Sequence, residues 1–250
     1  AGTSIKSSGE VFVWGFNLDT NPRQVRASIG IVPQEVNLDP FFTPKKLLEL
    51  HAGLYGVKKK DRITDTILKL VSLEDQANSY SRSLSGGMKR RLLVAKALVH
   101  QPPIVILDEP TAGVDVELRQ NLWSNVRELN ELGVTIVLTT HYLYEAQEMC
   151  NRIGIINNGN LVALDTTQKL LDRIESKKIK FKVKNLNQFE KIRLHGVKFS
   201  KTDSEIVATY DKGKFKFDQI IDAVKNNAEI LDISTDEGDL EDIFLEVTNK

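Results

Sequence analysis

Short runs of apolar residues, many of them β-branched, occur along this chain between longer segments in which apolar residues recur every three or four positions. Such a run is typical of a strand that is buried on both faces inside a parallel sheet. The clearest one, 104–107, leads directly into Asp108 and Glu109. We predict strands at 9–15, 28–32, 104–107 and 134–140. Strands that alternate with helices indicate an α/β fold.

The segments with helical spacing lie between and after these strands. We predict helices at 44–73, 89–99, 116–132 and 142–150, and a hairpin at 153–163. Thr43 and Pro44 are typical of a helix start, with a capping side chain before a proline in the first helical position. Gly133 is predicted to end the third helix as its C′ residue.

The pattern changes at about residue 166. Over 178–184 lysines alternate with apolar residues, which predicts a half-buried strand with a cationic outer face. A nucleic-acid or lipid surface is the alternative, but no aromatic platform shares that face, so a solvated strand face is the better interpretation. Further strands are predicted at 205–210 and 229–234, with helices at 217–226 and 240–247. We therefore predict a first domain at 1–165 and a small α+β accessory domain at 166–250.

Polar residues follow three of the predicted strands. Asp108 and Glu109 follow the second core strand, Gln34 comes shortly after the first, and His141 follows the third. Ligands of open α/β sheets bind outside the carboxyl ends of the strands, so these side chains lie where chemistry is expected. An adjacent acid pair can divide its work, one carboxylate holding a metal ion and the other polarising a water. The alternatives are a solvated acidic turn, a surface glutamine and a structural histidine.

A glycine pair opens another predicted helix. Ser85, Gly86 and Gly87 precede the helix-forming run of residues 89–99. Free N–H groups, a serine hydroxyl and no Cβ in the way together favour an anion site, for which phosphate is the usual ligand. A serine-capped helix with glycines in its lead-in explains the residues equally well.

Five motifs in this chain resemble those of the ATPase subunit of ATP-binding cassette (ABC) transporters, in the order of that family. They are Gln34, Leu84–Met88, Ile104–Glu109, Ala112–Asp115 and His141. The resemblance covers about residues 9–163, and five ordered motifs are far more specific than any single one. It implies an α/β fold of the P-loop NTPase (RecA-like) type, with a mostly parallel sheet, antiparallel β elements and a helical subdomain inserted at about 36–95. The C-terminal α+β appendage follows this core.

The resemblance implies a role for each matching residue. Gln34 is the Q-loop glutamine and contacts Mg²⁺, Asp108 is the Walker B aspartate that holds Mg²⁺, Glu109 is the catalytic base and His141 is the switch histidine. The remaining nucleotide-binding residues are those of the signature motif and the D-loop: Ser85, Gly86, Gly87 and Asp115. Phosphoryl transfer needs a metal ion, N–H donors and a water-orienting base, so these roles are physically reasonable.

The same resemblance implies ligands and partners. The ligands are ATP and Mg²⁺. Because the signature motif and Walker B motif of one protein serve different ATP sites, it implies a head-to-tail homodimer. The subtype most similar to this chain is the exporter ATPase that works with a separate ABC-2-type permease. Such a subunit is peripheral on the cytoplasmic face of the inner or plasma membrane and powers export by hydrolysing ATP.

One family motif has no match. The phosphate-binding P-loop, G-x-x-x-x-G-K-[ST], does not occur in the 250 residues, where the one Gly-Lys pair, Gly213-Lys214, is followed by Phe215. Family members carry this loop upstream of the position of Gly9. We expect that the chain is truncated at its N-terminus and that, as given, it binds ATP poorly and is inactive.

The composition bears on the partners, the compartment and the alternative functions. Lys plus Arg and Asp plus Glu number 34 each, so no global field favours nucleic acid, which we do not expect as a partner. One cysteine, Cys150, fits a reducing compartment, and neither an apolar run of membrane-spanning length nor a signal-peptide core is seen. Two other functions stay open, a soluble ABC ATPase that acts on ribosomes or DNA and a non-catalytic regulatory homologue without a P-loop.

Overall fold

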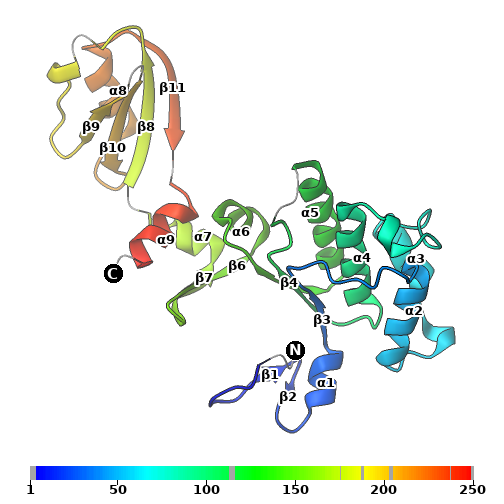
Figure 1. The fold of residues 1–250 in the computed structure, drawn as a ribbon. Coiled ribbons are helices and arrows are strands. Elements are labelled where there is room, and N and C mark those ends of the chain that lie inside the picture. The colour runs from blue at the N-terminus through cyan, green and yellow to red at the C-terminus, as the bar shows by residue number, and fades with distance from the viewer. Residues whose placement is uncertain are drawn as a thin grey trace. The chain divides into compact units, whose positions relative to one another are not determined.

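The fold is described from a computed structural model (Figure 1), which covers residues 4–112, 116–174, 176–186, 189–202, 205–236 and 238–248; the side chains of 116–118 lie outside this description. The chain divides into two compact units, Ala1–His141 and Tyr142–Lys250. Among the described residues, no helix has both the length and the apolar character that a membrane crossing requires.

The first unit contains a parallel three-stranded sheet and the helices that connect it. Its elements are β1 (Phe12–Val13), β2 (Phe16–Asn17), α1 (Pro22–Ala27), β3 (Ile29–Val32), α2 (Pro44–Leu54), η1 (Lys59–Asp61), α3 (Thr64–Leu70), η2 (Ser81–Ser83), α4 (Gly86–Leu98), β4 (Ile104–Asp108), α5 (Val116–Glu131) and β5 (Thr135–Thr139). The strand order is β3-β4-β5, with Val32 beside Leu107 and Asp108 beside Thr139. The three strands predicted for this sheet are confirmed, and their carboxyl ends lie at one edge.

In the part of the chain that the structure describes, only one face of this sheet is fully covered. Val32, Val105 and Leu107 are at most 1% exposed, whereas Ile31 and Val137 on the opposite face are 40% and 44% exposed. The predictions of a strand buried on both faces at 104–107 and of a buried strand at 134–140 are therefore wrong for the described residues. Ile104 and Ile106 of β4 are only half-buried, and the residues of β5 are half-buried or exposed.

Glycine permits the close packing of α4 on β3. A Cβ added at Gly30 would lie 2.3 Å from the carbonyl oxygen of Ala97, so no larger residue fits without moving the helix. The contact fixes α4, and with it the glycine pair at the start of that helix, relative to the sheet.

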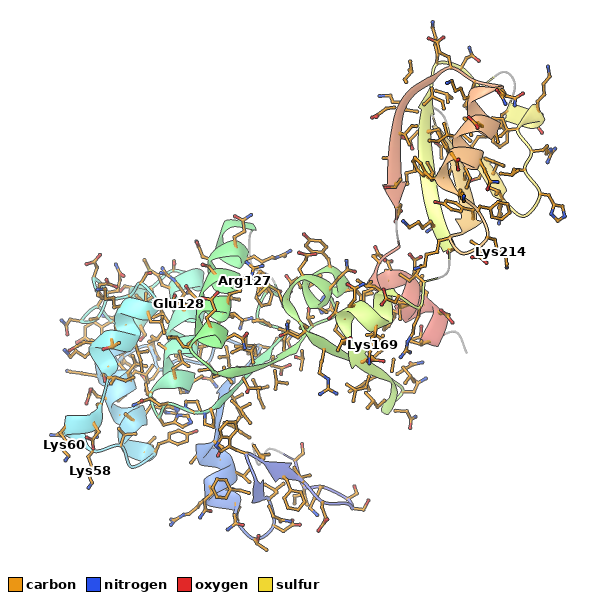
Figure 2. The ribbon with its side chains drawn as sticks, turned by 180° about the vertical axis from the view of Figure 1, so that it is seen from behind. Lys58, Lys60, Arg127, Glu128, Lys169 and Lys214 are labelled. Atoms are coloured by element: carbon orange, nitrogen blue, oxygen red, sulfur yellow. The ribbon has the colours of Figure 1, made fainter. Side chains whose placement is uncertain are left out.

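The long helix predicted at 44–73 is two helices, α2 and α3. It breaks at Gly56, whose φ of +80° is a left-handed conformation that ends a helix. The predicted cap is confirmed, since the Lys46 N–H donates to Thr43 Oγ1 at 3.3 Å. Figure 1 shows α2, α3 and α4 side by side, and Lys58 and Lys60 project from the tip of this helical segment (Figure 2).

Two glycine turns complete the first unit. The strand predicted at 9–15 is instead the short hairpin β1–β2, because Trp14 and Gly15 have φ values of +52° and +82°, which form a tight reversal between the strands. The predicted end of α5 is confirmed by Gly133, whose φ is +90°.

The second unit holds two separate cores. Its elements are α6 (Leu143–Met149), β6 (Arg152–Asn157), β7 (Asn160–Thr166), α7 (Thr167–Leu171), β8 (Ser176–Val183), η3 (Phe189–Lys191), β9 (Lys198–Lys201), β10 (Glu205–Asp211), α8 (Phe217–Lys225), β11 (Ile230–Asp236) and α9 (Leu240–Thr248). The hairpin β6–β7 shares one core with α6, α7 and α9, through Ala146, Ile153, Leu170 and Leu240. The domain boundary at 165/166 stays a prediction.

The other core lies under an antiparallel sheet of order β11-β8-β10-β9. Figure 1 shows α8 against this sheet, and Ile220 of α8 packs with Ile179 and Phe181 of β8. The βαββαβ order of the elements, with η3 as its first helix, is the ferredoxin-like arrangement. The predicted strand at 178–184 is confirmed, with its apolar residues buried and its lysines outside.

Candidate functional site

Asp108 and Glu109 point different ways although they are adjacent. Asp108 is the last residue of β4, and Glu109 has a φ of +43°, a left-handed conformation that is uncommon for a residue with a side chain. Asp108 Oδ1 accepts a hydrogen bond from Thr139 Oγ1 at 2.5 Å. The Glu109 N–H donates to Thr139 O at 3.0 Å, which ties the turn to β5. The left-handed residue thus separates the two carboxylates.

One carboxylate oxygen of Glu109 receives contacts from the ends of both neighbouring strands. Gln34 Nε2, which follows β3, donates to Glu109 Oε2 at 3.1 Å. His141 Nδ1, which follows β5, lies 3.2 Å from the same oxygen. Residues that are separated by 75 and 32 positions in the chain therefore meet at Glu109. The sequence placed them at the ends of strands in one sheet, and the structure adds that they contact one another.

The exposure of this cluster suits a reaction with water. The side chain of Glu109 is 30% exposed and that of His141 is 57% exposed. A carboxylate that is held on one side by an amide and an imidazole, and is open to solvent on the other, can orient a water molecule and accept its proton. The arrangement is that of a general base with supporting groups.

The donor set beside Glu109 fits Mg²⁺. Gln34 uses its Nε2 for Glu109, which leaves Oε1 as an acceptor, and Asp108 supplies an exposed carboxylate. The part of the chain that the structure describes has no group of three or more His, Cys, Asp or Glu side chains that could hold a metal ion. Mg²⁺ usually binds one or two protein oxygens together with phosphates and waters, and the oxygens of Asp108 and Gln34 are of the type that this ion takes.

The glycine pair opens α4 as part of the helix. α4 begins at Gly86, three residues before the predicted start, and Ser85 caps it by accepting from the Met88 N–H at 3.2 Å. A Cβ added at Gly86 would meet no atom of the described residues within 4 Å outside its own helix and chain neighbours, so packing among these residues does not explain this glycine. Among the described residues, no hydrogen bond joins Ser85, Gly86 or Gly87 to the acid cluster. Asp115 lies outside the described residues.

The sequence interpretation missed Arg90. Its side chain is 5% exposed, and it donates to main-chain carbonyls that follow β3 and β4. Burial lowers the pKa of Arg90 from its ordinary value. One signal was available, since Arg90 precedes Leu93, Val94 and Ala97 by three, four and seven positions, and therefore lies on the apolar face of α4.

Thr139 was also missed. It was predicted as part of a strand without a role, yet its hydroxyl donates to Asp108 and its carbonyl accepts from the Glu109 N–H. The strand register places it beside Asp108, which sequence periodicity alone does not reveal.

Comparison with known proteins identifies the family. Residues 1–112 match a family model described as ABC transporter. A linearmycin resistance ATP-binding protein of Bacillus subtilis is 30% identical over 254 aligned positions, which cover 97% of this chain and 81% of that protein. A Nod factor export ATP-binding protein of Rhizobium etli is 35% identical over 175 positions, covering 69% of this chain. The alignment spans only 55% of that second relative.

Two solved structures share the fold. A structure of an ATP-binding subunit of an ABC transporter has a TM-score of 0.56 and 28% identity, and the match covers 64% of this chain and 67% of that one. A dimeric ATP-binding cassette in a post-hydrolysis state, bound to ADP and Pi, has a TM-score of 0.55 and 28% identity, over 64% and 74% of the two chains. The predicted α/β fold of the P-loop NTPase class is confirmed. The chain therefore belongs to the ATP-binding proteins of ABC transporters, a family of ATPases, as the order of its motifs predicted.

Proposed function

We propose that this chain is part of the ATP-hydrolysing subunit that powers export through a membrane permease of the ABC-2 type. The observation that carries the proposal is the meeting of Gln34 and His141 on Glu109 Oε2, beside the carboxylate of Asp108. A fold needs no such cluster at the open end of its sheet, whereas ATP hydrolysis needs a base, a metal ligand and supporting polar groups there.

In the proposed mechanism Glu109 orients the attacking water and accepts its proton. Gln34 and His141 hold the carboxylate in place through their contacts with Glu109 Oε2. We further propose that His141 contacts the γ-phosphate of bound ATP. Asp108 and Gln34 would hold Mg²⁺, which when bound neutralises charge on the phosphate oxygens. Thr139 fixes the direction of Asp108 through its hydroxyl.

The signature residues are proposed to act on the ATP site of a second subunit, in a head-to-tail homodimer. Two observations support this. Within the described part of the chain, Ser85, Gly86 and Gly87 make no hydrogen bond to the acid cluster, and no atom outside the helix and its chain neighbours lies within 4 Å of a Cβ placed at Gly86. Backbone N–H groups without a covering side chain suit the approach of a phosphate. Asp115 is proposed to join the same nucleotide-binding set.

Export and the membrane partner are proposed from the relatives. Their names describe Nod factor export and linearmycin resistance, and both are ATP-binding proteins. We propose an ABC-2-type permease as the partner and the cytoplasmic face of the membrane as the location. Nucleic acid is not a proposed partner, because acidic and basic residues are equal in number.

The test uses the full-length protein that contains this chain, purified from the cells that produce it. We expect ATP hydrolysis that requires Mg²⁺ and co-purification with a membrane permease. Co-purification with ribosomes or DNA would favour the soluble ABC ATPase instead. A pure protein that binds ATP but never hydrolyses it would favour the regulatory homologue.

A further inference from the structure

We propose that Arg90 is a positioning residue that holds Glu109 and Gln34 in their reactive geometry. The inference rests on the proposed function, in which Glu109 is the general base. Arg90 lies on α4, four residues after Gly86, and its hydrogen bonds join it to main-chain carbonyls, not to the side chains of Glu109 and Gln34. It acts on the backbone that carries them.

The guanidinium of Arg90 joins two chain segments that are far apart in sequence. Its Nη1 donates to Pro33 O at 3.0 Å and to Gln34 O at 2.6 Å, at the end of β3. Its Nη2 donates to Glu109 O at 3.1 Å, and its Nε donates to Pro110 O at 3.0 Å, after β4. Four main-chain carbonyls from two strand ends thus share one buried side chain.

These contacts fall where the backbone is strained. Glu109 has a φ of +43°, and a left-handed residue with a side chain persists only when its surroundings hold it. The Glu109 N–H is held by Thr139 O, and its carbonyl is held by Arg90. Both peptide groups that flank the Cα of Glu109 are therefore fixed, and this directs its side chain toward Gln34 and His141.

The chemistry of the contact requires arginine. A guanidinium presents five N–H donors in a rigid planar fork, which can reach acceptors on two segments at once. A lysine ammonium is a single centre at the end of a flexible stem, so it cannot bond both Pro33–Gln34 and Glu109–Pro110 in this geometry. We therefore expect Arg90→Lys to keep the buried charge and lose the positioning.

The neighbouring arginine gives a matched control. Arg91 also donates to two main-chain carbonyls, those of Val71 and Ser72, at 3.0 and 2.9 Å. These lie at the end of α3, away from both strand ends. Arg91→Lys thus removes the same kind of contact from the same helix without touching the backbone of Gln34 or Glu109.

The experiment compares steady-state ATP hydrolysis of the full-length wild type, Arg90→Lys, Arg90→Gln, Arg91→Lys and Glu109→Gln, with the melting temperature of each. We expect both Arg90 variants to lower kcat about 10–100-fold, as expected when a catalytic group shifts by about 1 Å, with KM for ATP within about threefold of wild type. Arg91→Lys should stay within about twofold in both constants. In the double variant Arg90→Lys/Glu109→Gln, the Arg90 change should add nothing to the loss caused by Glu109→Gln.

The outcomes separate this inference from the proposed function. A wild type without hydrolysis that depends on Glu109 would overturn the function and the inference together. A folded Arg90→Lys protein with the kcat of wild type, beside an inactive Glu109→Gln protein, would overturn the inference alone. If neither Arg90 variant folds, or if Arg91→Lys lowers kcat equally, Arg90 is a structural residue and the inference is wrong.

Discussion

The β8–β11 sheet and the β3–β5 sheet of this protein carry their charged residues in different places. In the β8–β11 sheet, charges lie along the outer face and pair locally, as in Lys180–Asp236 at 3.6 Å and Lys184–Glu229 at 3.0 Å. In the β3–β5 sheet, the polar side chains collect at one end and meet on Glu109. Pairs along a solvated face need no function to explain them. A cluster built on a left-handed residue at a strand end does, because it stabilises the fold little and keeps the backbone strained.

The largest effect that would test this contrast is expected for Asp108→Asn. Loss of the carboxylate removes the proposed Mg²⁺ ligand, and we expect ATP hydrolysis to fall about 100-fold or more. The melting temperature should hardly change, because Asp108 is exposed and an amide oxygen can still accept from Thr139 Oγ1. Hydrolysis over a Mg²⁺ titration measures the first effect.

The matched control is Asp236→Asn, which removes an exposed carboxylate from the other sheet. It should leave hydrolysis unchanged. Equal losses in the two variants would remove the distinction between the sheets.

Gly86→Ala is expected to have the next largest effect. Among the described residues, a methyl group at Gly86 meets no atom within 4 Å outside its chain neighbours and its own helix, so the free energy of unfolding should stay the same or rise by up to about 1 kcal/mol. Hydrolysis should fall about tenfold or more, because the methyl group would lie between the proposed phosphate site and the helix N–H groups. Hydrolysis assays and chemical denaturation measure the two effects.

Gly30→Ala, in the same unit, is expected to lower stability where Gly86→Ala does not. Its methyl group would lie 2.3 Å from Ala97 O, and the clash should lower the free energy of unfolding by about 1–3 kcal/mol.

If Gly86→Ala hydrolyses ATP like wild type, the signature turn does not approach phosphate.

A third prediction concerns His51, whose imidazole the fold keeps uncharged. Burial, with smaller contributions from Lys96 and His100, lowers the pKa of His51 from 6.5 to about 4. The unfolded chain takes up a proton near pH 6.5 and the folded protein does not, so stability that is full above pH 6.5 is lost as the pH falls toward 4. Because the ring is half exposed, we expect His51→Gln to lose less stability than wild type over this window, by on the order of 1 kcal/mol.

Urea denaturation at pH 7, 5.5 and 4 measures this difference. Carboxylates that titrate in the same range are common to both proteins, so their effect cancels in the comparison. If the free energy of unfolding falls equally with pH in wild type and His51→Gln, the lowered pKa of His51 is contradicted.

The smallest effect on stability and activity is expected for a lysine on the outer face of β8. Lys180→Met removes an exposed ion pair with Asp236, and such pairs contribute about 0–1 kcal/mol to the free energy of unfolding. Figure 2 shows Lys214 near the end of β10, where it pairs with Asp211 at 2.8 Å in the same local manner. We expect denaturation curves and hydrolysis rates close to those of wild type. A large loss of activity in Lys180→Met would show that this face has a function of its own.

Local patterns predicted the strands and the residues at their ends. The apolar runs identified β3, β4 and β5 and placed Gln34, Glu109 and His141 at the ends of strands, where ligands bind. The contacts of Gln34 and His141 with Glu109 came from the structure. Side-chain periodicity did not reveal that one sheet face is open, because an apolar run looks the same whether a second layer covers it or not.

Contacts that depend on three-dimensional register were beyond the sequence. Thr139 acquires its role only because β5 pairs with β4 in a register that places it beside Asp108. Arg90 binds main-chain carbonyls, which every residue has, so its partners cannot be recognised from the residue types in a motif. The left-handed turn at Glu109 was equally hidden, since glutamate has no preference for that conformation.

The central claim is that the cluster at the end of β4 hydrolyses ATP with Glu109 as its base. The most direct measurement is the steady-state hydrolysis rate of full-length Glu109→Gln, alongside its ATP affinity. The substitution preserves size and removes the basic carboxylate, so we predict a loss of at least about 100-fold in kcat, with ATP affinity within about threefold of wild type. Hydrolysis at the wild-type rate in a folded Glu109→Gln protein would contradict the account.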